Sequence, residues 1–107
     1  MRTTHRPESG PNFTFTAELW EYSGKGAWIF VSVPPGQAED IRHLTDGRRG
    51  GFGSVKVAVT INGSHWSTSL FLSSEDGTFI LPVKKAIRQA EQVEAGDPVT
   101  VRLELLL

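Results

Sequence analysis

The chain has 107 residues, which is enough for one domain with a modest hydrophobic core. Its 11 basic and 12 acidic side chains nearly balance, so bulk electrostatic attraction to nucleic acid or to an anionic membrane is not expected, and any such binding must be local. Because cysteine is absent, disulfides, thiolate metal sites and a thiol nucleophile are excluded.

The first residues predict a disordered tail over 1–12, because they are polar and include Pro7, Gly10 and Pro11. They lack the hydrophobic stretch of a signal peptide, and no apolar run in the chain approaches the length of a membrane span. We therefore expect a cytoplasmic protein that does not engage a membrane, with a single folded domain over 13–107.

Two strands and a helix are predicted in the first half of this domain. Residues 13–20 alternate as a strand, and a glycine turn leads to an apolar second strand over 27–33 that ends at Pro34. A short helix follows over 37–44, with Glu39 and Asp40 in its first turn, where carboxylates are favourable. Residues 46–53 are rich in glycine and predict a flexible connection.

The central segment predicts a β-hairpin. Valines alternate with smaller or polar residues over 54–61, and Asn62-Gly63 predicts a type I′ turn with positive φ at both residues. Counting outward from this turn gives the register. The inner face then holds the pairs Val59–Trp66, Val57–Thr68 and Val55–Leu70, and the outer face holds Thr60–His65, Ala58–Ser67 and Lys56–Ser69.

The last third predicts a strand over 78–83, interrupted by Pro82, and a closing strand over 99–105. Between them lies a second helix from about 83 to 93. Its predicted buried stripe comprises Val83, Ala86, Ile87 and Ala90.

Hairpin-length links join most of these elements, which excludes a parallel sheet with helical crossovers. The predicted fold is mainly β: a small six-stranded β-barrel, closed or partly split, with two short helices. A weak internal repeat, marked by Ile41-Arg42 and Ile87-Arg88, is typical of a pseudo-symmetric barrel.

Several motifs occur together along the chain: Gly50-Gly51-Phe52-Gly53-Ser54-Val55, Ile61-Asn62-Gly63, Trp66-Ser67-Thr68-Ser69-Leu70-Phe71, Leu81-Pro82-Val83-Lys84, Arg88 and Gly96-Asp97. As a set they resemble the bacterial family of unknown function DUF1905, and the resemblance extends over nearly the whole chain from about Phe13. It implies a double-split β-barrel, the architecture shared with bacterial transition-state regulators and antitoxin DNA-binding domains, and it implies no activity.

The candidate ligand-binding residues are cations. Lys84 and Lys85 lie at the start of the second helix, where the positive end of the helix dipole disfavours them, and Arg88 lies one turn after Lys84. If Arg42, Arg48 or Arg49 folds nearby, an anion such as phosphate, nucleic acid or an acidic sugar would neutralise all these charges. The alternative is neutralisation by Glu75, Asp76 or Asp97 across a turn.

The loop Arg48-Arg49-Gly50-Gly51 is a second candidate, because glycine amides and guanidinium groups suit an oxyanion. The loop lacks the ending of a nucleotide P-loop, so a solvated connection is the favoured interpretation.

Catalytic, metal and cofactor sites are not predicted. His65, Ser67 and Ser69 project from one strand face, but same-face neighbours on a strand lie roughly 7 Å apart, too far for a hydroxyl-to-imidazole hydrogen bond. His5, His43 and His65 have no metal-ligand spacing.

Aromatic side chains form a further candidate, a stacking platform for bases or sugars. Trp20 and Tyr22 are predicted to be exposed, and core packing is favoured for the others: Trp28, Phe30, Phe52 and Trp66.

The sequence thus favours a non-catalytic binding module that engages an anionic ligand, nucleic acid or a protein partner. The alternative is a small enzyme or sugar-binding barrel with a central pocket around His65, Trp66 and Thr68. Open barrel edges also favour pairing between chains as a homodimer.

Overall fold

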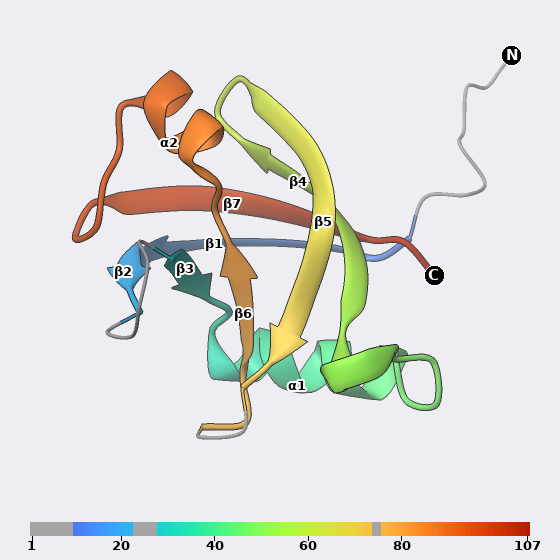
Figure 1. Ribbon diagram of the computed structural model, residues 1–107. Helices are drawn as coiled ribbons and strands as arrows, with labels where there is room; N and C mark the ends of the chain where they lie inside the picture. The colour runs from blue at the N-terminus through green and yellow to red at the C-terminus, as the bar shows by residue number, and fades with distance from the viewer. Residues whose placement is uncertain (1–9, 23–27, 74–75) are drawn as a thin grey trace, which may run out of the picture.

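The computed structural model describes residues 10–22, 28–73 and 76–107, which form one mainly β fold with two α-helices. Seven strands make a single sheet that curls into a nearly closed barrel, in the order β1-β7-β4-β5-β6-β3-β2 (Figure 1). The elements are β1 (Asn12–Glu18), β2 (Trp20–Glu21), β3 (Ile29–Ser32), α1 (Pro35–Leu44), the 3₁₀ turn η1 (Gly51–Gly53), β4 (Val55–Ile61), β5 (Ser64–Leu72), β6 (Phe79–Pro82), α2 (Lys85–Glu91) and β7 (Pro98–Leu105).

The barrel closes where the first strand crosses from one partner to another. β1 pairs with β7, whereas β2, directly after it, pairs with β3. Leu19 lies at the crossing, 2% exposed, and its N–H and C=O bond the loop before β7, at the Asp97 carbonyl and the Gly96 amide. The count of seven strands differs from the predicted six because this crossing divides the first strand.

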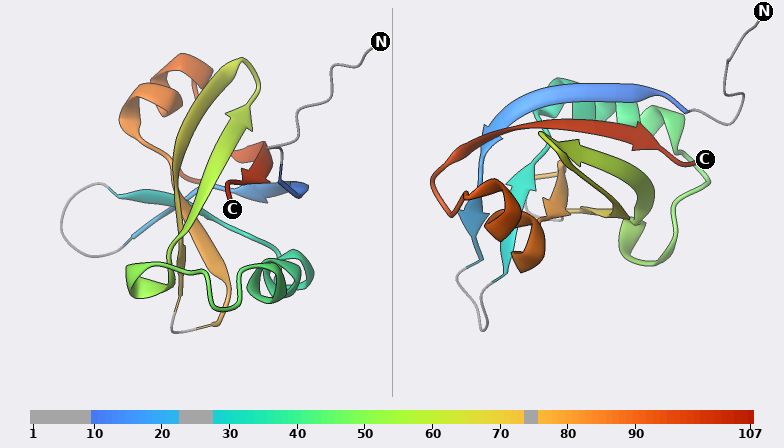
Figure 2. Two further views of the ribbon diagram at one scale, coloured as in Figure 1. Left: turned by 90° about the vertical axis from the view of Figure 1, so that its right-hand side faces the viewer. Right: turned by 90° about the horizontal axis from the view of Figure 1, so that it is seen from above.

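The two halves of the chain occupy equivalent places in the barrel. When β1 and β2 are counted as one strand, each strand of the first half has a counterpart in the second: β1 and β2 correspond to β5, β3 to β6, and β4 to β7. Exchanging these counterparts leaves the neighbours of every strand around the barrel unchanged. Each half also places one helix at an end of the barrel, with α1 at one end and α2 at the other (Figures 1 and 2). The weak repeat read from Ile41 and Ile87 is thus present in the topology, and both isoleucines are buried.

The central hairpin has the predicted register throughout, from Ile61–Ser64 to Val55–Leu70. Its turn differs from the prediction. Asn62 has a φ of 52°, but Gly63 does not adopt the left-handed region, so the turn is not type I′. The two-residue loop length and the alternating core positions are enough to fix the register.

Both helices differ in extent from the predicted ones. α1 starts earlier, at Pro35, because proline suits the first helical position; Glu39 and Asp40 therefore lie beyond its first turn. α2 is shorter and ends at Glu91, and the next residue, Gln92, has a φ of 57°. The predicted buried stripe is wrong at its alanines: Ala86 and Ala90 are exposed, and Ile87 is the buried residue of α2.

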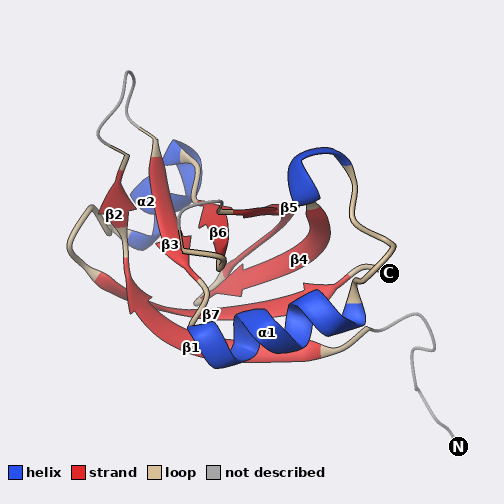
Figure 3. Cartoon of the chain, turned by 90° about the horizontal axis from the view of Figure 1, so that it is seen from below, coloured by secondary structure: helices blue, strands red, loops and turns tan. Residues whose placement is uncertain are grey.

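The described part of the N-terminal segment begins at Gly10, two residues before β1. Residues 1–9 of the predicted tail lie outside the described residues. From Gly10 onward the chain runs beside β7, where the Pro11 carbonyl accepts a 3.0 Å bond from the Leu105 amide. In Figure 3, which shows the molecule from below, α1 lies in front of β1 and β7 and runs along them, and Gln37 at its start donates a 3.0 Å bond to the Thr14 carbonyl of β1.

The barrel interior is a single core of aliphatic side chains with two phenylalanines. Its inward positions on β4 are the predicted valines, Val55, Val57 and Val59, and Thr45 and Thr78 are its buried polar members. The largest fully buried side chains are Phe79, Leu19, Ile41, Ile61, Leu70, Leu81, Leu103 and Leu105.

Truncation of Leu19 tests the crossing. We expect Leu19→Ala to lower the free energy of unfolding by about 2–5 kcal/mol, because it leaves a cavity where the barrel closes. Urea denaturation measures the loss. The exposed neighbour Glu18→Ala should change the value by less than about 0.5 kcal/mol, and equal losses in the two variants would contradict the assignment.

Candidate functional site

A cleft opens where β6 leaves β5. The two strands pair only at Phe71–Ile80 and Leu72–Phe79. Two residues beyond Ile80, Pro82 faces β5 without an N–H, so the next pair of the ladder loses one of its two hydrogen bonds, and the strands diverge there. The resulting cleft, here called the α2 cleft, has a volume of about 520 Å³. Its lining residues are Trp28, Ile29, Trp66, Ser67, Thr68, Pro82, Val83, Lys84, Lys85 and Arg88.

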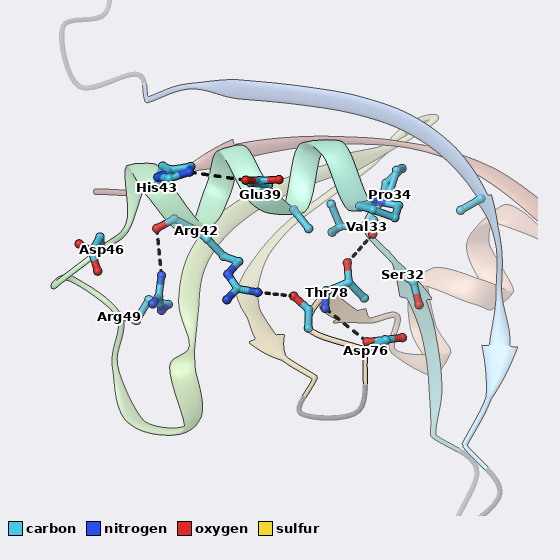
Figure 4. Close-up of a pocket in the computed structure, with 14 residues that line it drawn as sticks. Ser32, Val33, Pro34, Glu39, Arg42, His43, Asp46, Arg49, Asp76 and Thr78 are labelled. Carbon is cyan, nitrogen blue, oxygen red and sulfur yellow. Dashed lines mark hydrogen bonds and ion pairs between the residues drawn. The ribbon is translucent and has the colours of Figure 1, made fainter.

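The other half of the barrel carries the equivalent opening. The ladder between β2 and β3 ends at Trp20–Phe30, and a cleft of about 900 Å³, here called the α1 cleft, opens between α1, Ala17 of β1 and the turn before β6 (Figure 4). It has no lining residue in common with the α2 cleft. The fold therefore has the two splits that the sequence resemblance implied.

The α2 cleft carries a strong local positive charge. Lys84 and Lys85 are exposed, and Arg88 is half-buried at its rim. Arg88 donates from Nε to the Val83 carbonyl at 3.0 Å, which fixes the guanidinium plane and leaves its terminal N–H groups for other partners. Within the described ranges, none of the three cations forms an ion pair with a carboxylate.

The predicted alternative, neutralisation across a turn, does not occur at Asp76 or Asp97. The Asp97 side chain accepts from the Glu94 amide at 2.9 Å, and Asp76 accepts from the Thr78 amide at 3.3 Å. Both carboxylates hold their own turns. Glu75, the third candidate partner, lies outside the described residues.

The remaining walls of the α2 cleft are apolar and aromatic. Trp28 is 58% exposed, and Trp66 is half-buried against the core. Ile29 and Val83 are buried behind them, and Ser67 and Thr68 add hydroxyl groups. A ligand here would meet cations on one wall and indole rings on the others.

The structure divides the predicted ligand-binding residues between two places. Lys84, Lys85 and Arg88 line the α2 cleft, whereas Arg48 and Arg49 follow α1 at the other end of the barrel (Figure 1). The condition that an arginine of the first half folds beside Lys84 is therefore not met. The cause is the internal repeat, which places the two helices, and the loops that follow them, at opposite ends.

The arginines of the first half make structural hydrogen bonds. Arg49 donates from Nη1 to the Arg42 carbonyl at 3.1 Å and to the Thr45 hydroxyl at 3.0 Å, at the C-terminal end of α1. Arg42 donates to the Gly77 carbonyl at 3.0 Å and ties α1 to the β5–β6 turn (Figure 4). Arg48 is exposed, and the amide of Gly50 bonds the Ser54 carbonyl at 2.9 Å, so this amide is directed within the loop.

The α1 cleft has mixed charge. Its basic residues Arg42, His43 and Arg49 are accompanied by Glu39, Asp46 and Asp76. His43 Nε2 lies 3.8 Å from Glu39 Oε2 on the exposed face of α1 (Figure 4). Cations and carboxylates alternate around this opening, so it lacks the one-sided potential of the α2 cleft.

The histidine of the predicted central pocket lies apart from its expected companions. Trp66 and Thr68 line the α2 cleft, but His65 is exposed on the outer face, where its Nδ1 and the Thr60 hydroxyl are 3.1 Å apart. A pocket around all three residues is not formed, because consecutive strand positions alternate in direction. In the part of the chain that the structure describes, no three His, Asp or Glu side chains cluster as metal ligands.

A comparison with protein families agrees with the sequence resemblance. The model described as "Domain of unknown function (DUF1905)" matches residues 15–103. The chain belongs to the DUF1905 family. Its match covers every strand of the barrel at least in part and the whole α2 cleft. No curated protein matches the chain. Neither helix of this DUF1905 chain, within its described ranges, is long and apolar enough to span a membrane.

The aromatic residues of this DUF1905 domain form an outer row on β2 and β3. Trp20 and Phe30 have ring centroids 5.2 Å apart, and Phe30 stacks on Trp28 at 6.2 Å with an interplanar angle of 12°. Trp20 is half-buried and donates from Nε1 to the Ser32 hydroxyl at 2.9 Å, whereas Tyr22 is 53% exposed, as predicted. The side chain of Phe52 lies outside what the structure describes.

Core packing is the wrong prediction for Trp28, and Phe30 is only partly buried. The alternation of Ile29 and Val31 as inward residues contains the signal for this result, because it turns Trp28 and Phe30 outward. The sequence interpretation did not use that alternation, and so it missed Trp28 as a residue of the cleft.

Glu91 anchors the far end of α2 to the central hairpin. Its carboxylate accepts hydrogen bonds from the Ser64 hydroxyl and, at 3.0 Å, from the Asn62 amide. These bonds favour the charged form, so the Ser64 bond first and the Asn62 bond second lower the pKa of Glu91 below 4.5. This contribution to stability is present above pH 4.5 and is lost as the pH falls through the lowered pKa.

Removal of the Ser64 hydroxyl should therefore move this titration. We expect Ser64→Ala to raise the pKa of Glu91 toward 4.5, measured by carbon-detected NMR of the Glu91 carboxyl group. Ser67→Ala, on the same strand but without contact to Glu91, is the matched control and should leave the titration unchanged. An unaltered Glu91 pKa in Ser64→Ala would contradict the anchor.

Proposed function

We propose that this domain is a non-catalytic binding module and that its ligand is an anion held in the α2 cleft. The observation that carries the proposal is the cluster of Lys84, Lys85 and Arg88 around a cleft with two tryptophans. Clustered cations repel one another, and within the described ranges no carboxylate pairs with them. A bound anion would offset this repulsion.

The three cations would act differently on such a ligand. The lysines supply mobile point charges that can follow ligands of different shape, whereas Arg88 presents a planar fork to two oxygens at once. Trp28 and Trp66 would cover the apolar part of the ligand and exclude water, which strengthens the ion pairs. Ser67 and Thr68 would add hydrogen bonds.

The proposal keeps the helix start predicted from the sequence and leaves out the Arg-Gly loop. Arg49 is occupied by the carbonyl of Arg42 and the hydroxyl of Thr45, at the opposite end of the barrel. The ligand classes that fit a cationic cleft are small anions, a nucleic-acid backbone and an acidic protein segment. The family resemblance and the balanced composition favour a bacterial, cytoplasmic setting.

Substitution of the cations tests this function. We expect Lys84→Ala and Arg88→Ala each to weaken the binding of inorganic pyrophosphate or a short oligonucleotide by about tenfold, since a hydrogen bond to a charged group contributes roughly 1.5–3 kcal/mol. Isothermal titration calorimetry at two salt concentrations measures the change. Lys56→Ala, an exposed lysine on β4, is the matched control. Unchanged binding in both cleft variants would remove these residues from any site.

Covalent labelling separates the module from the hydrolase alternative. The His65 ring contacts the Thr60 hydroxyl. Within the described residues, neither Ser67 nor Ser69 has a hydrogen bond to an imidazole. We therefore expect a fluorophosphonate probe to leave Ser67 and Ser69 unlabelled, as judged by intact mass. Stoichiometric labelling that is lost in Ser67→Ala or Ser69→Ala would favour the enzyme instead.

A further inference from the structure

The edge of β5 that faces the α2 cleft has unpaired backbone groups. Pairing with β6 stops at Phe71, while pairing with β4 continues to Ser64. The Ser73 amide bonds the Thr78 carbonyl on the β6 side, at 2.7 Å. Because main-chain groups alternate in direction along an antiparallel strand, His65, Ser67 and Ser69 point their N–H and C=O groups to the same side. No described backbone group bonds them.

The opposite wall has matching groups. Val83 donates to the Ile29 carbonyl of β3 at 2.9 Å, so the carbonyl of Pro82 and the amide of Lys84 point the other way, toward β5. Neither has a backbone partner within the described ranges. The split therefore lies between two strand edges that each continue beyond their last shared hydrogen bond.

We propose that the ligand of the α2 cleft is an extended acidic segment of a partner protein, which adds to the open edge of β5 as a further strand. The inference rests on the proposed function and names its ligand. Backbone pairing would supply affinity without sequence specificity, and the lysines with Arg88 would select carboxylates. Trp28 and Trp66 would take the apolar side chains that alternate with them.

Charge identifies the occupant. The chain's own residues 1–9 hold Arg2, His5 and Arg6 against one acid, Glu8, so they do not complement a cationic cleft. A nucleic acid would use the cations, but it has no alternating amide and carbonyl groups to pair with the edge of β5. An acidic peptide uses both features.

The probe is a short fluorescent peptide in which glutamate and valine alternate, compared with the same peptide carrying lysine for glutamate. We expect binding of the acidic peptide alone, weakened by salt. Ser67→Pro should weaken it by tenfold or more, because proline removes the amide that faces the cleft and places a ring there. Ser67→Ala removes only the hydroxyl and keeps that amide, so it should weaken binding by clearly less than Ser67→Pro does.

The position chosen for proline is mild for the fold. The Ser67 main chain points away from β4, opposite Ala58, so the β4–β5 hydrogen bonds are retained. If the variant nevertheless unfolds, two measurements on the unaltered protein decide the matter. Amide exchange of Ser67 and Ser69 should slow when the acidic peptide is bound, and N-methylation of alternate peptide residues should abolish binding in one register and spare it in the other.

The outcomes separate the inference from the function beneath it. Binding of the acidic peptide with protected Ser67 and Ser69 amides supports strand addition. Binding of oligothymidine or pyrophosphate that depends on Lys84, without peptide binding or without amide protection, overturns strand addition and leaves the anion-binding function intact. Failure of every anion to bind overturns both.

Discussion

The missing N–H of Pro82 sets the point at which the barrel opens beside α2. Near Pro82, β6 still pairs with β3 on one side, but Pro82 has no N–H to donate to β5 on the other side. The strands separate at that point, the chain turns into α2, and the cations that follow the proline are carried to the mouth of the gap. Beside α1, the ladder between β2 and β3 ends at Trp20–Phe30, and the residue of β3 that corresponds to Pro82 is Ser32, which keeps its N–H. A proline therefore accounts for the split beside α2 alone.

Equivalent backbone geometry does not produce equivalent chemistry in the two openings. Beside α1, the arginines bond carbonyls of the fold itself, and acids lie among them. Beside α2, only the Nε of Arg88 is used in this way, and Lys84 and Lys85 remain exposed. The repeated topology thus provides two similar frames, in which one set of cations holds the structure together and the other is exposed to a ligand.

Much of the barrel could be predicted from the sequence because its strands alternate strictly and its links are short. The valines of β4 and the two-residue loop determine the hairpin register, even though Gly63 does not adopt the expected conformation. The helices were predicted less well, since their buried faces are narrow: Ile87 alone of α2 is buried, and the alanines beside it do not reveal which face is inward. The cations of the α2 cleft could be predicted together because Lys84, Lys85 and Arg88 are near one another in sequence. The positions of Arg49, far from this cleft, and of Trp28, inside it, depend on how the two halves of the chain pack into the barrel.

The bonds of Glu91 to Ser64 and Asn62 have a mechanical consequence for the split barrel. They join α2, which follows β6 on one side of the opening, to the tip of the hairpin, where β5 begins on the other side. The two sides also meet where β5 and β6 last pair, at Phe71 and Ile80. Because the opening is held at both ends, its width is set by the fold, and a chain that enters it must already be narrow and extended.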